Sequence, residues 1–287
     1  MTGVPGSTAH RAAPVEPVLV TVLCETGSSE RPDQVVGEEP LEIRLSSPST
    51  PPEPVAVTMR TPGNDFELAV GFLLTEGLVT DAHEVQSVKY CDLPDGDVQH
   101  FNVVTVASSR PTIVGSRRRE VLVSASCGVC GTATLDQLKD RCPALPTGKP
   151  IHADVLTSLP ATLQKRQRVF AQTGGLHGAG LFDTTGRAMA VREDVGRHNA
   201  VDKLVGWAAL QHRLPLDAAV LVVSGRVSYE IVQKAAVAGV TTLVAVSAPS
   251  SLAVATARAL DMTLAGFVRE GRANIYAGAW RVIGAPT

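Results

Sequence analysis

The sequence has no strong excess of either charge, because 26 lysine and arginine residues oppose 28 aspartate and glutamate residues, for a formal net charge of −2. This balance gives no general attraction to nucleic acid or to an anionic membrane surface, so neither is an expected partner. The chain also lacks any run of about 18 apolar residues, and we expect no transmembrane helix. Its first residues lack the apolar core of a secretory signal, which makes the cytoplasm the expected location.

Cysteine is scarce as well, with five residues among 287. Cys127 and Cys130 form a C-x-x-C motif, whereas Cys24, Cys91 and Cys142 are isolated. A structural zinc site needs two further ligands at motif-like spacing, and the sequence has neither a second C-x-x-C nor an H-x3-5-H. A structural disulfide is disfavoured in a reducing cytoplasm. We therefore predict that the protein holds no metal of its own and that its cysteine pair is reactive.

The segment around the C-x-x-C motif indicates a nucleophilic thiol. A strand-like run at 120–124 precedes the motif and a helix-like run at 132–140 follows it, which places Cys127 close to a helix N-terminus. The helix dipole and the free backbone N–H groups favour a thiolate there, and the thiolate is the nucleophile. Gly128 and Gly131 leave space around both sulfur atoms. A thioredoxin-like dithiol stays open as an alternative, because it has the same order of strand, C-x-x-C and helix.

The length of the chain favours two domains. We predict a disordered tail over residues 1–16, an N-terminal α+β domain over 17–150 that carries the C-x-x-C loop, and a C-terminal α/β domain over 151–287. In the N-terminal domain we expect strands at 18–23, 40–45, 55–59, 85–91 and 99–107, a helix at 66–76 capped by Asn64 or Asp65 and stopped by Gly77, and loops at 26–34 and 46–54.

The second half alternates apolar strand-like runs with helix-like runs, in the order β–α–β–α–β that implies parallel pairing. The strands are expected at 218–224, 241–247 and 263–268, and the helices at 229–238 and 251–260. The polar segments after the strands are then expected at one sheet edge: Ser224–Arg226, Ser247–Ser250 and Arg269–Arg272. Hydroxyls, free N–H groups and guanidinium groups there suit an anionic, nucleotide-sized ligand, although each segment alone could be a cap or a turn.

Two polar segments between the halves have no assigned role. Gly174–Phe182 is rich in glycine around His177, but it is not a P-loop, so nucleotide hydrolysis is not supported. Arg192–Asn199 has a high density of hydrogen-bonding side chains just before a helix-like run at 200–209. This segment is either a solvated turn or a network that binds a ligand or holds a dimer interface.

Six motifs follow one another along the chain: TPGNDFELAVGFLLTEGL, SCGVCG, GGLHGAGLF, REDVGRHNAVDKL, SGRVSYE and FVREGRANIY. In this combination, over roughly residues 18–282, the chain resembles the FdhD family, the formate dehydrogenase accessory sulfurtransferases. The resemblance implies a cytidine-deaminase-like α/β/α core with a smaller N-terminal α+β domain, and a homodimer. It implies no deaminase activity, since the H-x-E…P-C-x-x-C zinc constellation is absent.

The resemblance also implies the residues and partners of the reaction. The first cysteine of the motif, Cys127, would carry sulfur as a persulfide, with Cys130 beside it. The stretch that contacts the molybdenum cofactor would be Phe267, Val268, Arg269, Glu270, Gly271 and Arg272. A cysteine desulfurase would donate the sulfur, and bis-molybdopterin guanine dinucleotide, with GDP as its mimic, would receive it before insertion into formate dehydrogenase.

Two other functions remain open from the sequence. One is a chaperone that binds the molybdenum cofactor and whose C-x-x-C is regulatory or binds zinc. The other is a thiol–disulfide oxidoreductase, which would form a stable disulfide between Cys127 and Cys130 and have no affinity for a guanine nucleotide.

Overall fold

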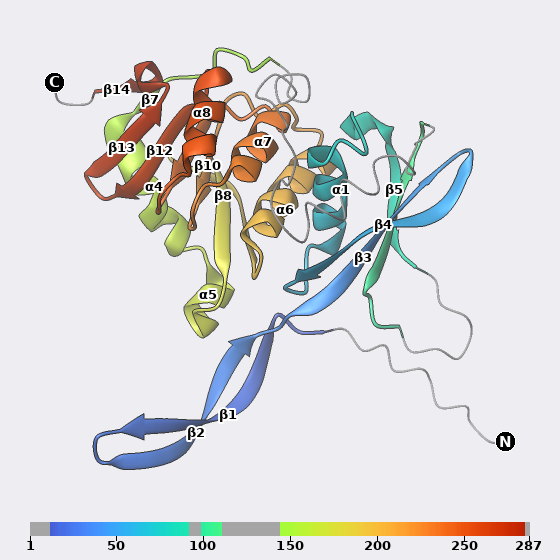
Figure 1. Cartoon of the computed structure of the whole chain (residues 1–287), viewed down its shortest axis with the longest axis vertical. Helices are drawn as coiled ribbons and strands as arrows, with labels where there is room; N and C mark the ends of the chain where they lie inside the picture. The colour runs from blue at the N-terminus through green and yellow to red at the C-terminus, as the bar shows by residue number, and fades with distance from the viewer. Residues whose placement is uncertain (1–11, 92–98, 111–143, 285–287) are drawn as a thin grey trace.

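A six-stranded sheet forms the centre of the second half in the computed structural model, which describes residues 12–91, 99–110 and 144–284 (Figure 1). Its strands lie in the order β13-β12-β11-β10-β8-β9. They are β8 (His177–Asp183), β9 (Ala188–Asp194), β10 (Ala219–Val223), β11 (Thr242–Ala245), β12 (Thr263–Arg269) and β13 (Arg272–Ala277). β10, β11 and β12 are parallel, which confirms the predicted β–α–β–α–β unit, while β8, β9 and β13 add to it in antiparallel fashion.

Helices cover both faces of this sheet. Successive residues of a strand point to opposite faces, so Leu221 and Val223 pack with the helices of one layer and Val220 and Val222 with the helix of the other. The first layer holds α6 (Arg197–Leu210), α7 (Tyr229–Val237) and α8 (Ser251–Ala259), and the second holds α4 (Ala153–Gln164). Burial on both faces explains why these strands are continuous apolar runs in the sequence.

The first half forms a four-stranded sheet in the order β4-β3-β6-β5, packed against a helix. These elements are β3 (Glu39–Ser47), β4 (Thr50–Arg60), α1 (Asp65–Thr75), β5 (Val85–Tyr90) and β6 (Val103–Ser108). The predicted helix start and stop are confirmed: Asn64 is the N-cap residue, with a φ of 58°, and Gly77 follows the helix with a φ of 71°. The loop predicted at 46–54 is wrong for most of its length, because an edge strand such as β4 tolerates prolines.

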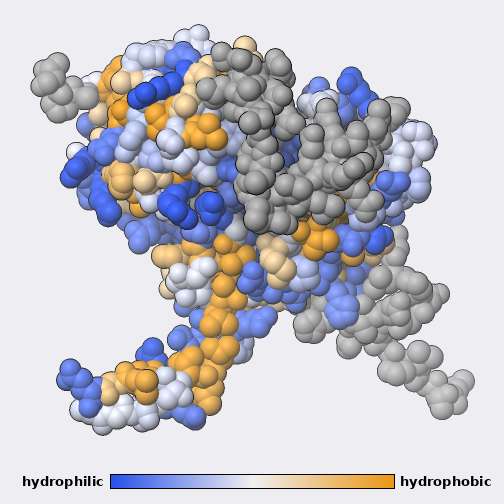
Figure 2. All heavy atoms as spheres, viewed as in Figure 1, coloured by the Kyte–Doolittle hydropathy of each residue, from blue (hydrophilic) through white to orange (hydrophobic). Residues whose placement is uncertain are grey.

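The loop predicted at 26–34 is also wrong, because β2 (Gly27–Val36) pairs antiparallel with β1 (Val15–Cys24). β1 also begins inside the predicted tail of residues 1–16. The β1–β2 ribbon extends away from the rest of the molecule beyond its contact with α5 (Figure 1), so nearly all of β2 is exposed and needs no apolar alternation. Leu19 and Leu23 are 67% and 80% exposed on it, and Figure 2 shows hydrophobic residues along the ribbon.

Short elements complete the described chain: α5 (Arg168–Thr173), β7 (Ile151–His152) paired with β14 (Val282–Ile283), and two 3-10 helices at Ala82–Glu84 and Ala279–Arg281. None of the described helices is long and apolar enough to cross a membrane.

The two halves meet where α1 packs against α6, and the contact is made by backbone atoms. A Cβ atom on Gly71 would collide with the carbonyl group of Asp202, and a Cβ atom on Gly206 would collide with that of Glu67. Glycine at both positions therefore allows the two helices to approach more closely than side chains would permit. The hydrophobic core is continuous across this contact, since one cluster of buried residues includes members of both halves.

A buried ion pair lies beside this helix crossing. Lys234 of α7 donates to Asp202 Oδ2 at 3.0 Å, to Glu76 Oε1 at 2.9 Å and to Thr75 Oγ1 at 2.8 Å. Burial raises the pKa of Asp202 to about 6, although the Lys234 ammonium opposes the rise. The carboxyl group is therefore ionised at neutral pH and links α6 to α1 through the shared lysine.

Gly206→Ala tests the helix crossing. In an ordinary helix this change stabilises by up to about 1 kcal/mol. Here we expect it to lower the free energy of unfolding by about 1–3 kcal/mol, because the added methyl group must push α1 away. Urea unfolding followed by circular dichroism would measure the change. Gly71→Ala should act with the same sign and less than additively with it, and a more stable variant of either kind would contradict the packing described.

Candidate functional site

Three polar segments lie together at one edge of the six-stranded sheet, where the parallel strands β10, β11 and β12 end. They are Ser224–Arg226, Ser247–Ser250 and Phe267–Arg272, and we call them the polar edge. Their predicted meeting at one edge is confirmed by the parallel pairing of the three strands. In open α/β sheets, ligands bind outside the carboxyl ends of the strands. The polar edge is therefore the candidate functional site.

Backbone hydrogen bonds join the three segments of the polar edge. Val227 N–H donates to the carbonyl group of Ala248 at 3.1 Å, and Ser250 N–H donates to that of Val227 at 2.9 Å. Phe267 N–H donates to the carbonyl group of Ser247 at 3.1 Å. The Ser250 hydroxyl also caps α8, as predicted, by accepting from Ala253 N–H at 3.2 Å. These bonds fix the positions of the loops relative to one another.

The stretch from Arg269 to Arg272 closes a hairpin between β12 and β13. Arg269 ends β12 and Arg272 begins β13, so the two arginines face each other as cross-strand partners. Only Glu270 and Gly271 make the turn, and Gly271 has a φ of 71°. All four residues are exposed. Like charges directly opposite each other destabilise a sheet, so an anion bound between the two guanidinium groups would relieve a repulsion.

Phe267 presents an aromatic ring at the polar edge, since its side chain is 43% exposed while the next residue, Val268, is fully buried. Its φ of 51° is unusual for a bulky residue and coincides with a β-bulge between Gly266 and Arg269. The backbone turn at the bulge breaks the normal alternation and brings the ring to the surface. The six residues Phe267 to Arg272 thus present one exposed aromatic ring and two exposed arginine side chains on one short stretch of chain.

The structure adds residues to this edge that the sequence did not place there. β8 runs antiparallel to β10, so its first residue, His177, lies beside the loop that follows β10. β9 runs back to the same edge and ends at Asp194, and α6 then begins at Arg197. A Cβ atom on Gly225 would lie 3.3 Å from His177 Nδ1 and 3.8 Å from Arg197 Cδ, which shows how closely these residues approach. The two segments without an assigned role, Gly174–Phe182 and Arg192–Asn199, therefore both reach the candidate site.

Asp194 is the centre of a buried network at the start of α6. It is fully buried, and Lys203 Nζ lies 2.7 Å from its Oδ2 atom. It accepts from the backbone N–H of Gly196 at 2.8 Å and of Thr61 at 3.2 Å, and from Asn199 Nδ2 at 3.0 Å. The segment Arg192–Asn199 was expected to be either a solvated turn or a network. The structure shows a hydrogen-bonded network, which links the two halves of the same chain.

His198 belongs to the same edge but is a neutral hydrogen-bonding group at pH 7. Its Nε2 atom lies 3.2 Å from Ser228 Oγ, just before α7. Burial, together with the positive charges of Arg197 and Lys234, lowers the pKa of His198 to about 4. The imidazole therefore positions the loop before α7 and adds no charge to the candidate site.

The second part of the predicted site lies elsewhere in the chain. Cys127 and Cys130 fall within 111–143, outside the described residues, so their predicted role stays a prediction. Among the residues that are described, no group of three or more His, Cys, Asp and Glu side chains is placed to hold a metal ion.

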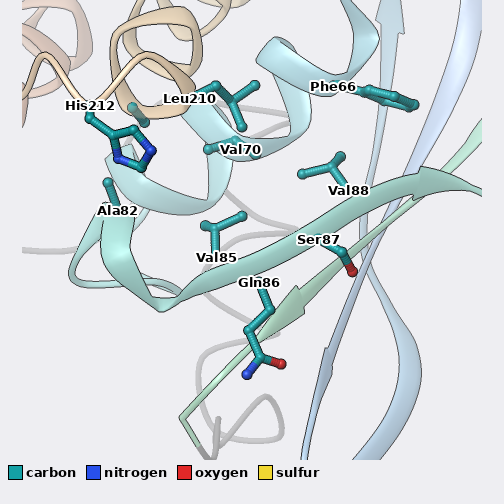
Figure 3. Close-up of a pocket in the computed structure, with 10 residues that line it drawn as sticks. Phe66, Val70, Ala82, Val85, Gln86, Ser87, Val88, Leu210 and His212 are labelled. Atoms are coloured by element: carbon teal, nitrogen blue, oxygen red, sulfur yellow. The ribbon is translucent and has the colours of Figure 1, made fainter.

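A hollow of about 290 Å³ lies between α1, β5 and the end of α6, away from the polar edge (Figure 3). Its lining is mostly apolar and includes Phe66, Val70, Val88 and Leu210. α6 has 14 residues and begins at the polar edge, so its far end is about 20 Å from that edge at a rise of about 1.5 Å per residue. The hollow and the candidate site are therefore separate.

The fold and the polar edge together define an α/β protein with a positively charged site at the ends of its parallel strands. The chain belongs to the FdhD/NarQ family, whose model matches residues 36–283. It is 48% identical over 266 residues to the sulfur carrier protein FdhD of Nocardia farcinica, an alignment that covers 92% of this chain and 93% of that protein. It is 45% identical over 282 residues to the sulfur carrier protein FdhD of Anaeromyxobacter dehalogenans, covering 94% and 96%.

A solved structure shares the fold. A crystal structure from Desulfotalea psychrophila, described as that of a formate dehydrogenase accessory protein, superposes with a TM-score of 0.73. The superposition covers 94% of this chain and 99% of that chain, at 23% sequence identity. At this identity the likeness supports the mixed α/β fold alone.

Lys203→Met tests the network that holds the start of α6. The change leaves the buried Asp194 carboxylate without its counter-ion, and we expect a loss of about 3–5 kcal/mol in the free energy of unfolding. Adding Asp194→Asn should recover part of the loss, because the unpaired charge is removed. The exposed Lys165→Met is the matched control and should leave stability unchanged. Equal stability of Lys203→Met and Lys165→Met in chemical denaturation would show that the pair has no structural role.

Proposed function

We propose that this protein is a sulfur carrier for formate dehydrogenase, which accepts sulfur as a persulfide on Cys127 and transfers it to bis-molybdopterin guanine dinucleotide. The observation that carries the proposal is the identity of 48% to a sulfur carrier protein FdhD over nine-tenths of both chains. The C-x-x-C motif supplies a thiol for sulfur transfer, and the polar edge supplies groups that suit a guanine dinucleotide.

The proposed loading step is a thiol exchange. The Cys127 thiolate attacks the terminal sulfur of a persulfide on a cysteine desulfurase. A new S–S bond forms on Cys127, the old S–S bond breaks, and the desulfurase cysteine leaves as a thiolate, with no net oxidation or reduction. In the second step the acceptor attacks the terminal sulfur with its own electron pair. The S–S bond then breaks with its electrons on Cys127 Sγ, which is restored as a thiolate.

Phe267 to Arg272 are the proposed binding residues for the dinucleotide. The exposed ring of Phe267 can stack on a planar base or pterin. The paired guanidinium groups of Arg269 and Arg272 can donate to phosphate oxygens, and Gly271 leaves room for a close approach. Glu270 and the buried Val268 complete the hairpin that holds these groups.

The proposal has three further parts: the type of core, the oligomeric state and the location. The three-layer second half is compatible with a cytidine-deaminase-like core and the first half with a smaller α+β domain. The exposed apolar residues of the β1–β2 ribbon favour a homodimer, because an isolated two-stranded ribbon is marginally stable in water. A cytoplasmic location would give the protein access to the desulfurase and to formate dehydrogenase.

The second candidate is a chaperone that binds the molybdenum cofactor and whose C-x-x-C is regulatory or binds zinc. The polar edge supports this reading equally well, since it concerns ligand binding alone. Only the sulfur-carrier proposal requires Cys127 to gain one sulfur atom. Measuring that gain therefore distinguishes the two functions.

Cys127→Ala should abolish sulfur loading while the fold is kept. Mass spectrometry after incubation with a cysteine desulfurase and cysteine would show a gain of one sulfur atom on the wild-type peptide that holds Cys127. Cys130→Ala should reduce transfer without removing it. Cys24→Ala is the matched control, because hydrogen bonding to Thr26 lowers the pKa of this exposed thiol, which makes it the most suitable described cysteine for non-specific loading. Loading that persists in Cys127→Ala and vanishes in Cys24→Ala would reverse the assignment.

Arg272→Ala should weaken the binding of GDP. A charge-assisted contact to a phosphate is worth about 1.5–3 kcal/mol, which corresponds to roughly a tenfold to hundredfold loss in affinity. Sulfur loading of Cys127 should be unaffected, since the donor is proposed to act at the C-x-x-C motif. Titration calorimetry would measure the GDP affinity, with Arg187→Ala, an exposed arginine at the opposite edge of the sheet, as the control. GDP affinity that is unchanged in both Arg269→Ala and Arg272→Ala would exclude the hairpin as the nucleotide site.

A further inference from the structure

A second group of basic side chains lies at the polar edge, two strands away from the Arg269–Arg272 hairpin. It consists of His177 at the start of β8, Arg197 at the start of α6 and Arg226 after β10, and we call it the basic cluster. The cluster surrounds Gly225, whose absent side chain leaves His177 Nδ1 and Arg197 Cδ accessible from the loop. The three residues come from separate elements, and the sheet topology brings them together.

The basic cluster has a net positive field. The pKa of His177 is lowered by burial and then by the charges of Arg197 and Arg226, which shows that both guanidinium groups act on the imidazole. Asp194 opposes them, but Lys203 lies 2.7 Å from its carboxylate and offsets its charge. Neither Arg197 nor Arg226 forms an ion pair with any residue that the structure describes. The Glu230 carboxylate interacts with the charge of Arg197 without forming an ion pair, and one carboxylate against two guanidinium groups leaves a net positive charge, so the grouping suggests an anionic ligand.

Two observations indicate an anion as that ligand. The Nε atom of Arg197 is buried and has no hydrogen-bond partner in the described part of the chain, an arrangement that is costly unless a ligand accepts the bond. α6 begins at the same residue after Gly196, with no side chain capping its free N–H groups, so the positive end of the helix dipole adds to the field. Buried N–H donors, guanidinium groups and a helix N-terminus together are the groups that hold phosphate.

The position of the basic cluster relates it to the Arg269–Arg272 hairpin. The cluster lies at the end of β10 and the hairpin at the end of β12, with β11 between them. Neighbouring strands lie about 4.8 Å apart, so the strand ends that carry the two groups are separated by about 10 Å along one edge, a gap that long arginine side chains can narrow from both sides. Val227, Ala248 and Ser247 bridge this interval through the backbone hydrogen bonds that join the loops. One extended ligand with more than one anionic group can reach both.

We propose that the basic cluster is a second phosphate subsite of the polar edge, which binds a diphosphate group of the nucleotide ligand. The identity of the ligand as a guanine nucleotide rests on the proposed function, whereas the phosphate chemistry rests on the cluster itself. Arg197 Nε and the first N–H groups of α6 donate from the buried side, and Arg226 closes over the group from the exposed side. His177 donates a further hydrogen bond.

Inorganic diphosphate and GDP are the probes that test the subsite. Both should raise the melting temperature of the wild-type protein, because a ligand that binds only the folded state stabilises it. Arg197→Gln and Arg226→Gln should each weaken the binding of both probes at least tenfold, and His177→Gln should weaken it less. Without ligand, Arg226→Gln should not melt earlier than the wild type, since it removes one of two like charges from an exposed position. Arg187→Gln removes an exposed charge at the opposite edge and should bind both probes normally.

The outcomes separate this subsite from the proposed function. Arg272→Ala should still bind inorganic diphosphate at the basic cluster, even where its affinity for GDP falls. GDP affinity that is lost in Arg272→Ala but unchanged in Arg197→Gln and Arg226→Gln would overturn the subsite and leave the sulfur-carrier function standing. Inorganic diphosphate that stabilises the protein without being displaced by GDP would also overturn it, because the cluster would then serve a free anion. A Cys127→Ala protein that binds both probes normally but gains no sulfur would support both proposals.

Discussion

The contact between the backbones of α1 and α6 is the constraint on which the rest of the arrangement depends. Gly71 and Gly206 allow the two helices to touch without intervening side chains, so the first half of the chain is held directly on the helix that starts at the polar edge. The buried lysines at 203 and 234 then find acceptors from both halves within reach. Wider spacing of the helices would leave these charges buried and unpaired, which proteins avoid.

The buried carboxylates of the protein form ion pairs, whereas the arginines at the polar edge form none with any residue that the structure describes. Asp194 and Asp202 are buried, and each is paired with a lysine at 3.0 Å or less. Arg197 and Arg226 lie at the polar edge, where Arg197 interacts with the charge of Glu230 but neither arginine forms an ion pair with a described residue. The distribution favours a ligand as the missing partner.

The sequence predicted those parts of the fold that local patterns determine. The runs at 218–224 and 241–247 are buried on both faces, and Ser250 caps α8, so hydropathy and capping rules sufficed. β2 is polar because most of it is exposed, and β13 was not expected as a strand because it follows β12 after a turn of only two residues. His177 could not be placed at the site from the sequence. Its strand, β8, joins the parallel strands in antiparallel fashion, and this pairing depends on tertiary contacts that no local sequence pattern indicates.

The loops of the polar edge are joined to one another by hydrogen bonds between backbone atoms. A ligand bound there would lose little affinity to ordering of the protein, since those loops are already fixed in place. The same rigidity has a second effect. The hydrogen bonds between the loops oppose a movement that would expel what is bound, so the residence time at this edge would be set mainly by the contacts with the ligand. Delivery of a ligand would then require a recipient that competes for those contacts one at a time, rather than a movement of the carrier.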